Sequence, residues 1–237
     1  MKDIIIITGD SRGLGKEIAI KLANKYNEYY IIGISRAKTA EIESANYIHI
    51  EYDLSDVNGI KKLYNEKIKK YGKIKALIYN SGVAYDDLVT NINFDSLQKM
   101  YNVNVFSSMF LAKYAIRDML LNHCAGSLVF ISSICAHTGY KGLAMYASTK
   151  SAIEAFSKTI AREWGEMGIR SNCIAPGFMD TDMSSTLDEG TKKRIYARTA
   201  LKMPTDISCV ADMAVYLISE NAKSITGQTI IIDNGTI

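Results

Sequence analysis

Two residues near the middle of the chain, Tyr146 and Lys150, have side-chain types and a spacing suited to proton transfer. They lie four residues apart in a segment that reads as a helix, and side chains at i and i+4 are neighbours on one helix face. A tyrosine has an unperturbed pKa of about 10, and bringing it toward 7 takes about 4 kcal/mol, which a nearby cation helps to supply. Tyr71 and Lys75 share this spacing across Gly72, at a predicted helix end, so spacing alone does not identify a site.

The segment before Tyr146 gives the pair a context. Residues 126–133 read as a buried strand that ends in Ser132 and Ser133. Alternate residues of a strand point to opposite sides, so we expect Ser133 to face the site and Ser132 to be structural. A hydroxyl, a phenol and an ammonium are thereby predicted to meet at one strand end.

A glycine-rich turn lies close to the start of the chain. The apolar run Ile4 to Thr8 is typical of a parallel strand buried on both faces, and helical periodicity follows it. The turn between them contains Gly9, Gly13 and Gly15, which allow a phosphate to approach the helix N-terminus. An ordinary strand-to-helix turn is the alternative, although the flanking strand and helix favour a cofactor.

The end of the second predicted strand bears on the choice of cofactor. In nucleotide-binding α/β folds an acidic residue here takes the ribose hydroxyls, whereas an arginine accommodates a 2′-phosphate. This chain has Ser35 and Arg36, so NADP(H) is expected over NAD(H). The second and later strands, apart from the one before Ser133, are expected over residues 29–34, 48–52, 75–79, 169–175 and 229–232.

Helical segments alternate with these strands. Asn58 to Tyr71 is amphipathic, Phe94 to Leu121 is long and contains Asn104 among apolar neighbours, and a third helix is expected over Ile207 to Leu217. A buried Asn must find partners, in a structural hydrogen bond or a polar network. Strands and helices alternate seven times, which predicts an α/β fold with a Rossmann-type, doubly wound parallel sheet. We expect a single domain over residues 1–237. In such sheets ligands bind at the carboxyl ends of the strands. The polar stretch Asp180 to Met203 is expected to be a mobile lid.

Composition excludes several classes of protein. The 237 residues are 48% hydrophobic and carry a net charge of +3, without a basic and aromatic cluster for nucleic acid. Apolar runs are of strand length, and the first residues pass directly into a strand, so neither a membrane span nor a signal peptide is expected. The four cysteines have no metal-type or disulfide-framework spacing. We therefore expect reduced thiols in a cytoplasm and no metal.

In order along essentially the whole chain, these motifs resemble the short-chain dehydrogenase/reductase family, and residues 172–183 and 225–233 look most like bacterial 3-oxoacyl-[acyl-carrier-protein] reductases. The resemblance implies that Tyr146 gives a proton to a carbonyl oxygen while the nicotinamide delivers hydride. Lys150 would lower the tyrosine pKa and bind the nicotinamide ribose, Ser133 would hold the carbonyl oxygen, and Asn104 would position a water next to Lys150. Besides Tyr146 and Lys150, the implied cofactor-binding residues are Thr8, Gly9, Ser11, Arg12, Gly13, Leu14, Gly15, Ser35, Arg36, Asp53, Leu54, Asn80, Ser81, Gly82, Pro176, Gly177, Phe178 and Thr181.

The resemblance carries further expectations about assembly and substrate. A homotetramer is expected through the long helices after the fourth and fifth strands, with a dimer next, on a face that includes Ala152, Ala155, Phe156 and Ile160. Carrier-dependent members place basic residues before two glycines that correspond to Gly126 and Gly168. This chain has Cys124, Ser127 and Met167 there, so free and carrier-bound ketones are expected to react about equally.

Other functions remain open at this stage. The same scaffold serves reductases or dehydrogenases of nucleotide sugars and of secondary metabolites. A regulatory or scaffold protein that binds cofactor without chemistry is a further alternative, and the intact set of Asn104, Ser133, Tyr146 and Lys150 argues against it. His137 is expected to be a loop residue without an evident partner, and His49 to serve packing or the surface.

Overall fold

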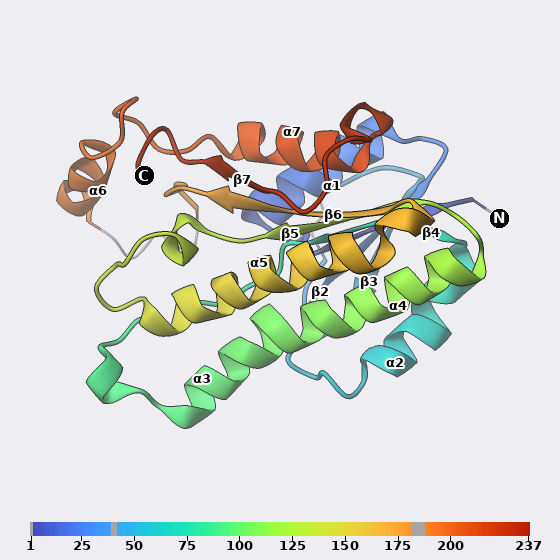
Figure 1. Ribbon diagram of the computed structural model, residues 1–237, viewed down its shortest axis with the longest axis horizontal. Coiled ribbons are helices and arrows are strands. Elements are labelled where there is room, and N and C mark those ends of the chain that lie inside the picture. Colours follow the sequence, from blue (N-terminus) through green and yellow to red (C-terminus); the bar gives the residue numbers. More distant parts are fainter. Residues whose placement is uncertain (1, 39–41, 182–187) are drawn as a thin grey trace.

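A seven-stranded parallel sheet forms the centre of the computed structural model, which describes residues 2–38, 42–181 and 188–237. The strand order is β3-β2-β1-β4-β5-β6-β7 (Figure 1), so the chain starts in the middle of the sheet and fills both sides in turn. This confirms the predicted doubly wound sheet. The strands are β1 (Ile4–Thr8), β2 (Tyr30–Ser35), β3 (Tyr47–Glu51), β4 (Ile74–Tyr79), β5 (Gly126–Ile131), β6 (Ile169–Pro176) and β7 (Thr229–Ile232).

Helices cover both faces of this sheet (Figure 1). One apolar cluster joins Ile5 and Ile7 of β1 to α1 (Gly13–Lys25) and α7 (Ile207–Ile218). The other joins Ile4 and Ile6 to α2 (Ile60–Lys62), α4 (Ser107–Leu121) and α5 (Ala144–Trp164). Since successive side chains of a strand point to opposite faces, the run of isoleucines in β1 supplies both halves of the core.

Both long helical segments contain turns of π-helix. Within the predicted helix over residues 58–71, α2 begins at Ile60 and is followed by η1 (Leu63–Ile68) and a 3₁₀ turn, η2 (Lys69–Tyr71). The predicted helix from Phe94 to Leu121 comprises α3 (Phe94–Tyr101), η4 (Asn102–Phe106) and α4. The π-helical turn η4 contains Asn104, and such turns are frequent at functional sites. The remaining short elements are η3 (Val89–Asn91), η5 (Ile134–Ala136), η6 (Gly165–Met167), α6 (Glu189–Tyr196) and η8 (Glu220–Ala222).

Two connections differ from the sequence prediction. The described residues between β2 and β3 contain no helix, so the predicted alternation of strands and helices is wrong at that crossover. In the predicted lid, residues 188–203 contain α6, and residues 182–187 lie outside the described part of the chain. Across residues 2–38, 42–181 and 188–237, no helix is long and apolar enough to cross a bilayer.

The helix face expected to pair with another subunit is partly occupied by the chain's own core. Ile160 is only 2% exposed, and the ring of Phe156 packs edge-on against Phe130 of β5. The prediction is wrong for Ile160, because helical spacing alone does not say which of two apolar faces points inward, whereas Ala155 on the same helix is exposed. Exposed apolar side chains lie instead on or beside α4, where Phe110 is 41% exposed and Leu121 73% exposed.

Candidate active site

The predicted catalytic residues gather where β4 and β5 end. Tyr146 and Lys150 lie on successive turns near the start of α5, which begins at Ala144. The Lys150 Nζ lies 5.5 Å from the centroid of the Tyr146 ring and donates a hydrogen bond of 2.8 Å to the carbonyl oxygen of Ile131, the last residue of β5. Ser133 follows two residues later, and its hydroxyl lies close enough to the Tyr146 phenol to lower the pKa of that phenol. The three side chains therefore share one site.

Burial controls the protonation of this group. It raises the pKa of Tyr146 above its ordinary value, the Cys135 thiol adds to the increase, and the nearby Ser133 hydroxyl opposes it. Burial also lowers the pKa of Lys150 from 10.5 to about 8, because the ammonium is only 4% exposed. In the protein alone desolvation dominates the pKa of Tyr146, and the implied lowering of that pKa by Lys150 stays a prediction. Tyr146 holds its proton at neutral pH.

Asn104 joins three elements around this group. Its Oδ1 accepts a hydrogen bond of 2.8 Å from the amide of Val83, and its Nδ2 donates to the Val83 carbonyl at 2.9 Å and to Thr149 Oγ1 at 3.0 Å. A Cβ added to Gly82 would lie 3.4 Å from Lys150 Nζ and 3.6 Å from Asn104 Oδ1. Asn104 thus connects the segment that follows β4, at Val83, with Thr149 of α5. Its implied role in holding a water stays a prediction.

The glycine-rich turn between β1 and α1 has little room for side chains. Gly9 and Gly13 have φ of 72° and 53°, and a Cβ on Gly15 would lie 2.0 Å from the carbonyl oxygen of Gly9. Thr8 Oγ1 accepts hydrogen bonds of 3.0 Å from the amides of Asn80 and Ser81. Thr8 therefore connects the turn to the end of β4. These two hydrogen bonds stabilise the backbone conformation of the glycine-rich turn.

Polar residues after β2 and β3 extend the site to one side. Ser35 is buried and donates to the carbonyl of Ala37 at 2.9 Å, whereas Arg36 is exposed. Asp53 accepts a hydrogen bond of 2.8 Å from the amide of Ser55. This bond lowers the pKa of Asp53, and the positive charge of Arg36 lowers it further. Leu54 is 5% exposed and packs in the core, and its implied contact with the adenine stays a prediction.

The segment after β6 extends the site to the other side. Pro176 ends β6, and a Cβ on Gly177 would lie 2.6 Å from Thr205 Oγ1. The Phe178 ring lies 5.9 Å from that of Tyr196 in α6, centroid to centroid. A Cβ on Gly13 would lie 3.9 Å from Thr181 Cγ2, so this segment reaches the glycine-rich turn. Of the other predicted contact residues, Ser11 is half-buried, Arg12 is the N-cap residue of α1, and Leu14 is buried.

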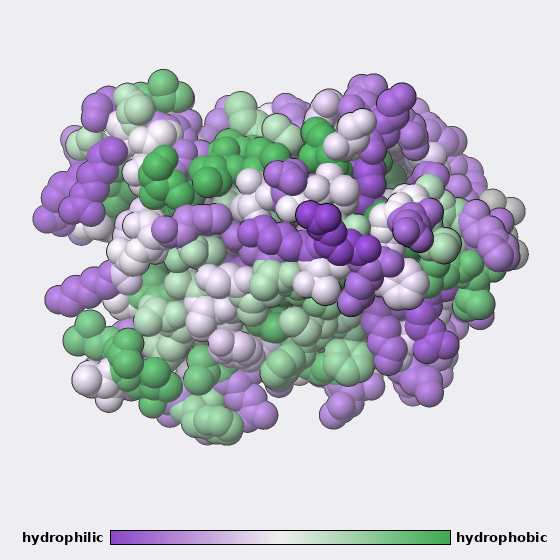
Figure 2. All heavy atoms as spheres, in the orientation of Figure 1, coloured by the Kyte–Doolittle hydropathy of each residue, from purple (hydrophilic) through white to green (hydrophobic). Residues whose placement is uncertain are grey.

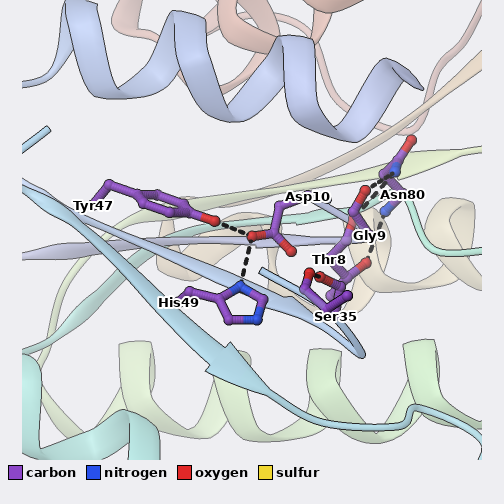
Figure 3. A network of polar contacts seen from close by, with 8 residues as sticks. Thr8, Gly9, Asp10, Ser35, Tyr47, His49 and Asn80 are labelled. Carbon is purple, nitrogen blue, oxygen red and sulfur yellow. Dashed lines mark hydrogen bonds and ion pairs between the residues drawn. The ribbon is translucent and has the colours of Figure 1, made fainter. Parts of the chain in front are cut away.

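Sequence reasoning missed a buried acid under the glycine-rich turn. Figure 3 shows Asp10 directed toward β3, where its Oδ2 accepts hydrogen bonds from Tyr47 and from His49 Nδ1, the latter at 3.1 Å. A Cβ on Gly33 would lie 1.9 Å from the same oxygen, so the glycine in β2 makes room for the carboxylate. His49 is thus a hydrogen-bond partner of Asp10, whereas the sequence analysis expected it to serve packing or the surface. Asp10 and His49 are 39 positions apart in the sequence, so no local sequence pattern reveals the contact.

The expectation of an isolated His137 is also wrong. Its Nε2 lies 2.9 Å from Glu154 Oε1, which also accepts a hydrogen bond of 2.5 Å from Ser132 Oγ. Glu154 is buried on α5, one turn after Lys150. The sequence signal that could have indicated this contact is an acidic residue, Glu154, one helical turn after the candidate catalytic residue Lys150. The expectation that Ser132 has a structural role agrees with it.

Comparisons with known proteins agree in the kind of protein they find. Residues 9–236 match the family model described as Enoyl-(Acyl carrier protein) reductase. The 3-oxoacyl-[acyl-carrier-protein] reductase FabG of Buchnera aphidicola subsp. Baizongia pistaciae is 33% identical over 239 residues, which cover 99% of this chain and 97% of that protein. Carbonyl reductase family member 4 of Xenopus laevis is 30% identical over 239 residues, 99% of this chain and 98% of that protein.

A solved structure adds a comparison of the whole fold. The structure described as ElxO with NADP bound superposes with a TM-score of 0.90 at 29% identity and covers 100% of this chain and 99% of its own. The similarity therefore extends over the entire sheet and both helical layers.

Proposed function

The chain belongs to the short-chain dehydrogenase/reductase family of oxidoreductases, and from that premise we propose that it transfers hydride between NADP(H) and a ketone or secondary alcohol. The observation that carries the proposal is the convergence of Ser133, Tyr146 and Lys150 at the end of β5. A phenol that keeps its proton at neutral pH is a suitable acid for the direction of reduction.

A nicotinamide dinucleotide fits the glycine-rich turn. The side chain of the N-cap residue Arg12 makes no capping hydrogen bond to α1, and the first turn of α1 contains no acidic residue. A helix N-terminus of this kind attracts phosphate through its N–H groups and dipole. Gly9 and Gly13 have positive φ, which favours glycine, and without a Cβ they place no side chain between the backbone and a phosphate. The turn would therefore hold the pyrophosphate, and Asn80 and Thr8 would keep it in shape.

The proposed division of labour gives each side chain one task. When bound, the nicotinamide supplies or accepts the hydride. Ser133 would hold the carbonyl oxygen, and Tyr146 would donate its proton to that oxygen as negative charge develops there. Lys150 would bind the nicotinamide ribose and favour the ionised phenol once its proton has left. Asn104 would keep the chain after β4 and α5 at a fixed separation.

The end of the site near β2 supports NADP(H). Arg36 is exposed beside Ser35, and no acidic residue ends β2. A charge-assisted hydrogen bond from a guanidinium to a phosphate is stronger than a neutral one. The structure described as ElxO with NADP bound has the same overall fold. These two observations favour NADP(H). The assay described below also includes NADH and would detect a preference for NAD(H).

A partly apolar substrate such as a 3-oxoacyl thioester is the substrate class that we propose. Figure 2 shows hydrophobic side chains gathered at the lower left of the molecule. The segment between β4 and α3, together with the first residue of α3, exposes Leu88, Val89, Ile92 and Phe94 by 44% to 70%. The amide of Asp87 donates a hydrogen bond of 3.0 Å to the carbonyl of Gly142, close to the start of α5. The apolar segment therefore borders the proposed active site.

Assembly, carrier use and location complete the proposal. We propose a homotetramer in a reducing cytoplasm, where the four free thiols would be stable. Met167, which is 57% exposed before Gly168, offers no cation for an acidic carrier. Carrier-bound and free thioesters should then give similar kcat/KM. A carrier preference above about a hundredfold, worth about 2.7 kcal/mol, would show that other cations recognise the carrier.

The proposed function is tested by supplying ketones and short 3-oxoacyl thioesters to the purified protein with NADPH or NADH. Loss of nicotinamide absorbance with at least one ketone, and a higher kcat/KM with NADPH, is the expected result. Cofactor binding without turnover of any carbonyl compound in either direction would instead favour the regulatory or scaffold alternative.

A further inference from the structure

The buried carboxylate of Glu154 has no task in the proposed mechanism. It lies on α5 one turn beyond Lys150 and is 6% exposed. Removing a carboxylate from water is unfavourable unless hydrogen bonds or charges compensate it. Its Oε1 accepts hydrogen bonds from Ser132 Oγ at 2.5 Å and is 2.9 Å from His137 Nε2. Since a carboxylate oxygen is an acceptor, the imidazole is assigned as the donor.

The two partners of Glu154 bracket the segment that carries Ser133. Ser132 lies directly before Ser133, and His137 directly follows η5. Within this segment, Ser133 Oγ accepts a hydrogen bond of 3.2 Å from the amide of Cys135 and so caps η5 at its N-terminus. The direction of the Ser133 hydroxyl is therefore coupled to the shape of the turn. Glu154 fixes that shape from both ends.

We propose that the hydrogen bond between His137 and Glu154 is a positioning element that keeps the Ser133 hydroxyl directed at Tyr146. The inference rests on the proposed function, because Ser133 is assigned there to the carbonyl oxygen. Neither His137 nor Glu154 touches the reacting atoms in this account. The side chain of His137 is 27% exposed, so it closes the buried network at its solvent edge.

The test compares two substitutions of the same residue. His137→Leu removes the donor, whereas His137→Gln places an amide nitrogen near the position of Nε2. A displacement of about 1 Å at a reacting group costs on the order of a hundredfold in rate, so a smaller displacement of Ser133 should lower kcat in His137→Leu by about tenfold. The Kd for NADPH should stay within about twofold, because no cofactor contact changes. His137→Gln should recover most of kcat.

Two further variants keep the comparison interpretable. Lys141→Leu makes a similar change at an exposed position of the same loop and should leave kcat unchanged. Ser132→Ala removes the other donor to Glu154, and a similar loss of kcat is expected. It therefore tests the network even where His137→Leu does not fold. An unchanged kcat in both His137→Leu and Ser132→Ala overturns the proposal, as does an equal loss in His137→Leu and His137→Gln.

Hydrogen exchange separates this inference from the proposed function. Amide exchange over residues 133–138 is measured by mass spectrometry on the unmodified protein and on both donor-removing variants, without substrate. Faster exchange confined to this segment in the variants is expected, since a local opening becomes easier when its anchor is lost. Unchanged exchange contradicts the positioning role whether or not a ketone is reduced. Absence of ketone turnover in the unmodified protein contradicts the proposed function, while exchange still reports on the anchor.

Discussion

Replacing Lys150 with methionine should make the protein more stable at neutral pH while removing its activity. Burial lowers the pKa of Lys150 from 10.5 to about 8. Each pKa unit corresponds to about 1.36 kcal/mol, so keeping this ammonium charged inside the fold costs about 3 kcal/mol at pH 7. Methionine has an unbranched stem and no charge. The lost hydrogen bond to the carbonyl of Ile131 should cost about 1 kcal/mol, which leaves a net gain of about 2 kcal/mol.

The sign of the effect with pH follows from proton binding. Between pH 8 and 10.5 the unfolded chain binds more protons at Lys150 than the folded chain does, so the stability of the unmodified protein rises with pH relative to the variant. The cost of the buried charge is fully present below pH 8 and is lost by about pH 10.5. The advantage of Lys150→Met should therefore shrink through this window and end about 1 kcal/mol in favour of the unmodified protein, which keeps its hydrogen bond.

Urea unfolding of both proteins at several pH values between 7 and 10.5 gives the difference in free energy of unfolding directly. Groups other than Lys150 titrate in this range, but they are common to both proteins and cancel in the difference. A variant that is less stable at pH 7, or a difference that does not change between pH 8 and 10.5, would refute the claim that a buried, readily deprotonated lysine lies at this site.

Further substitutions test other parts of the account. Ser35→Asp with Arg36→Ala should shift kcat/KM from NADPH toward NADH, because an acid replaces a cation near the proposed 2′-phosphate; an unchanged ratio would contradict the assignment. Gly33→Ala should lower the free energy of unfolding by about 1–3 kcal/mol, since its Cβ would lie 1.9 Å from Asp10 Oδ2, and Asp10→Ala should relieve the loss. Light scattering should give a tetramer at micromolar concentration and a smaller species for Phe110→Glu; a monomeric unmodified protein would count against assembly.

The sheet could be predicted from the sequence because its determinants are local. The apolar run of β1 and the glycine-rich turn after it specify a strand, a turn and a helix within adjacent residues. Residues that end parallel strands meet at one edge, so Ser133 and Tyr146 could be placed together without coordinates. The spacing of Tyr146 and Lys150 then placed the lysine on the same face of α5.

The parts that could not be predicted depend on contacts between distant segments. Asp10 reaches β3, and its link to His49 appears only when the sheet brings β2 and β3 together. The pairing of His137 with Glu154 requires the turn after β5 to fold back over α5. Ile160 has helical spacing on an apolar stripe with Ala155, yet only the packed structure shows that Ile160 faces the chain's own core while Ala155 is exposed.

Tyr146→Phe tests the central claim most directly, because it removes one transferable proton and leaves the ring in place. Steady-state turnover with NADPH and an accepted ketone is measured beside a fluorescence titration of NADPH. The account predicts that turnover falls by at least about a hundredfold, the lower end for loss of a general acid, while the Kd for NADPH changes little. Turnover close to that of the unmodified protein would contradict the assignment of Tyr146 as the proton donor.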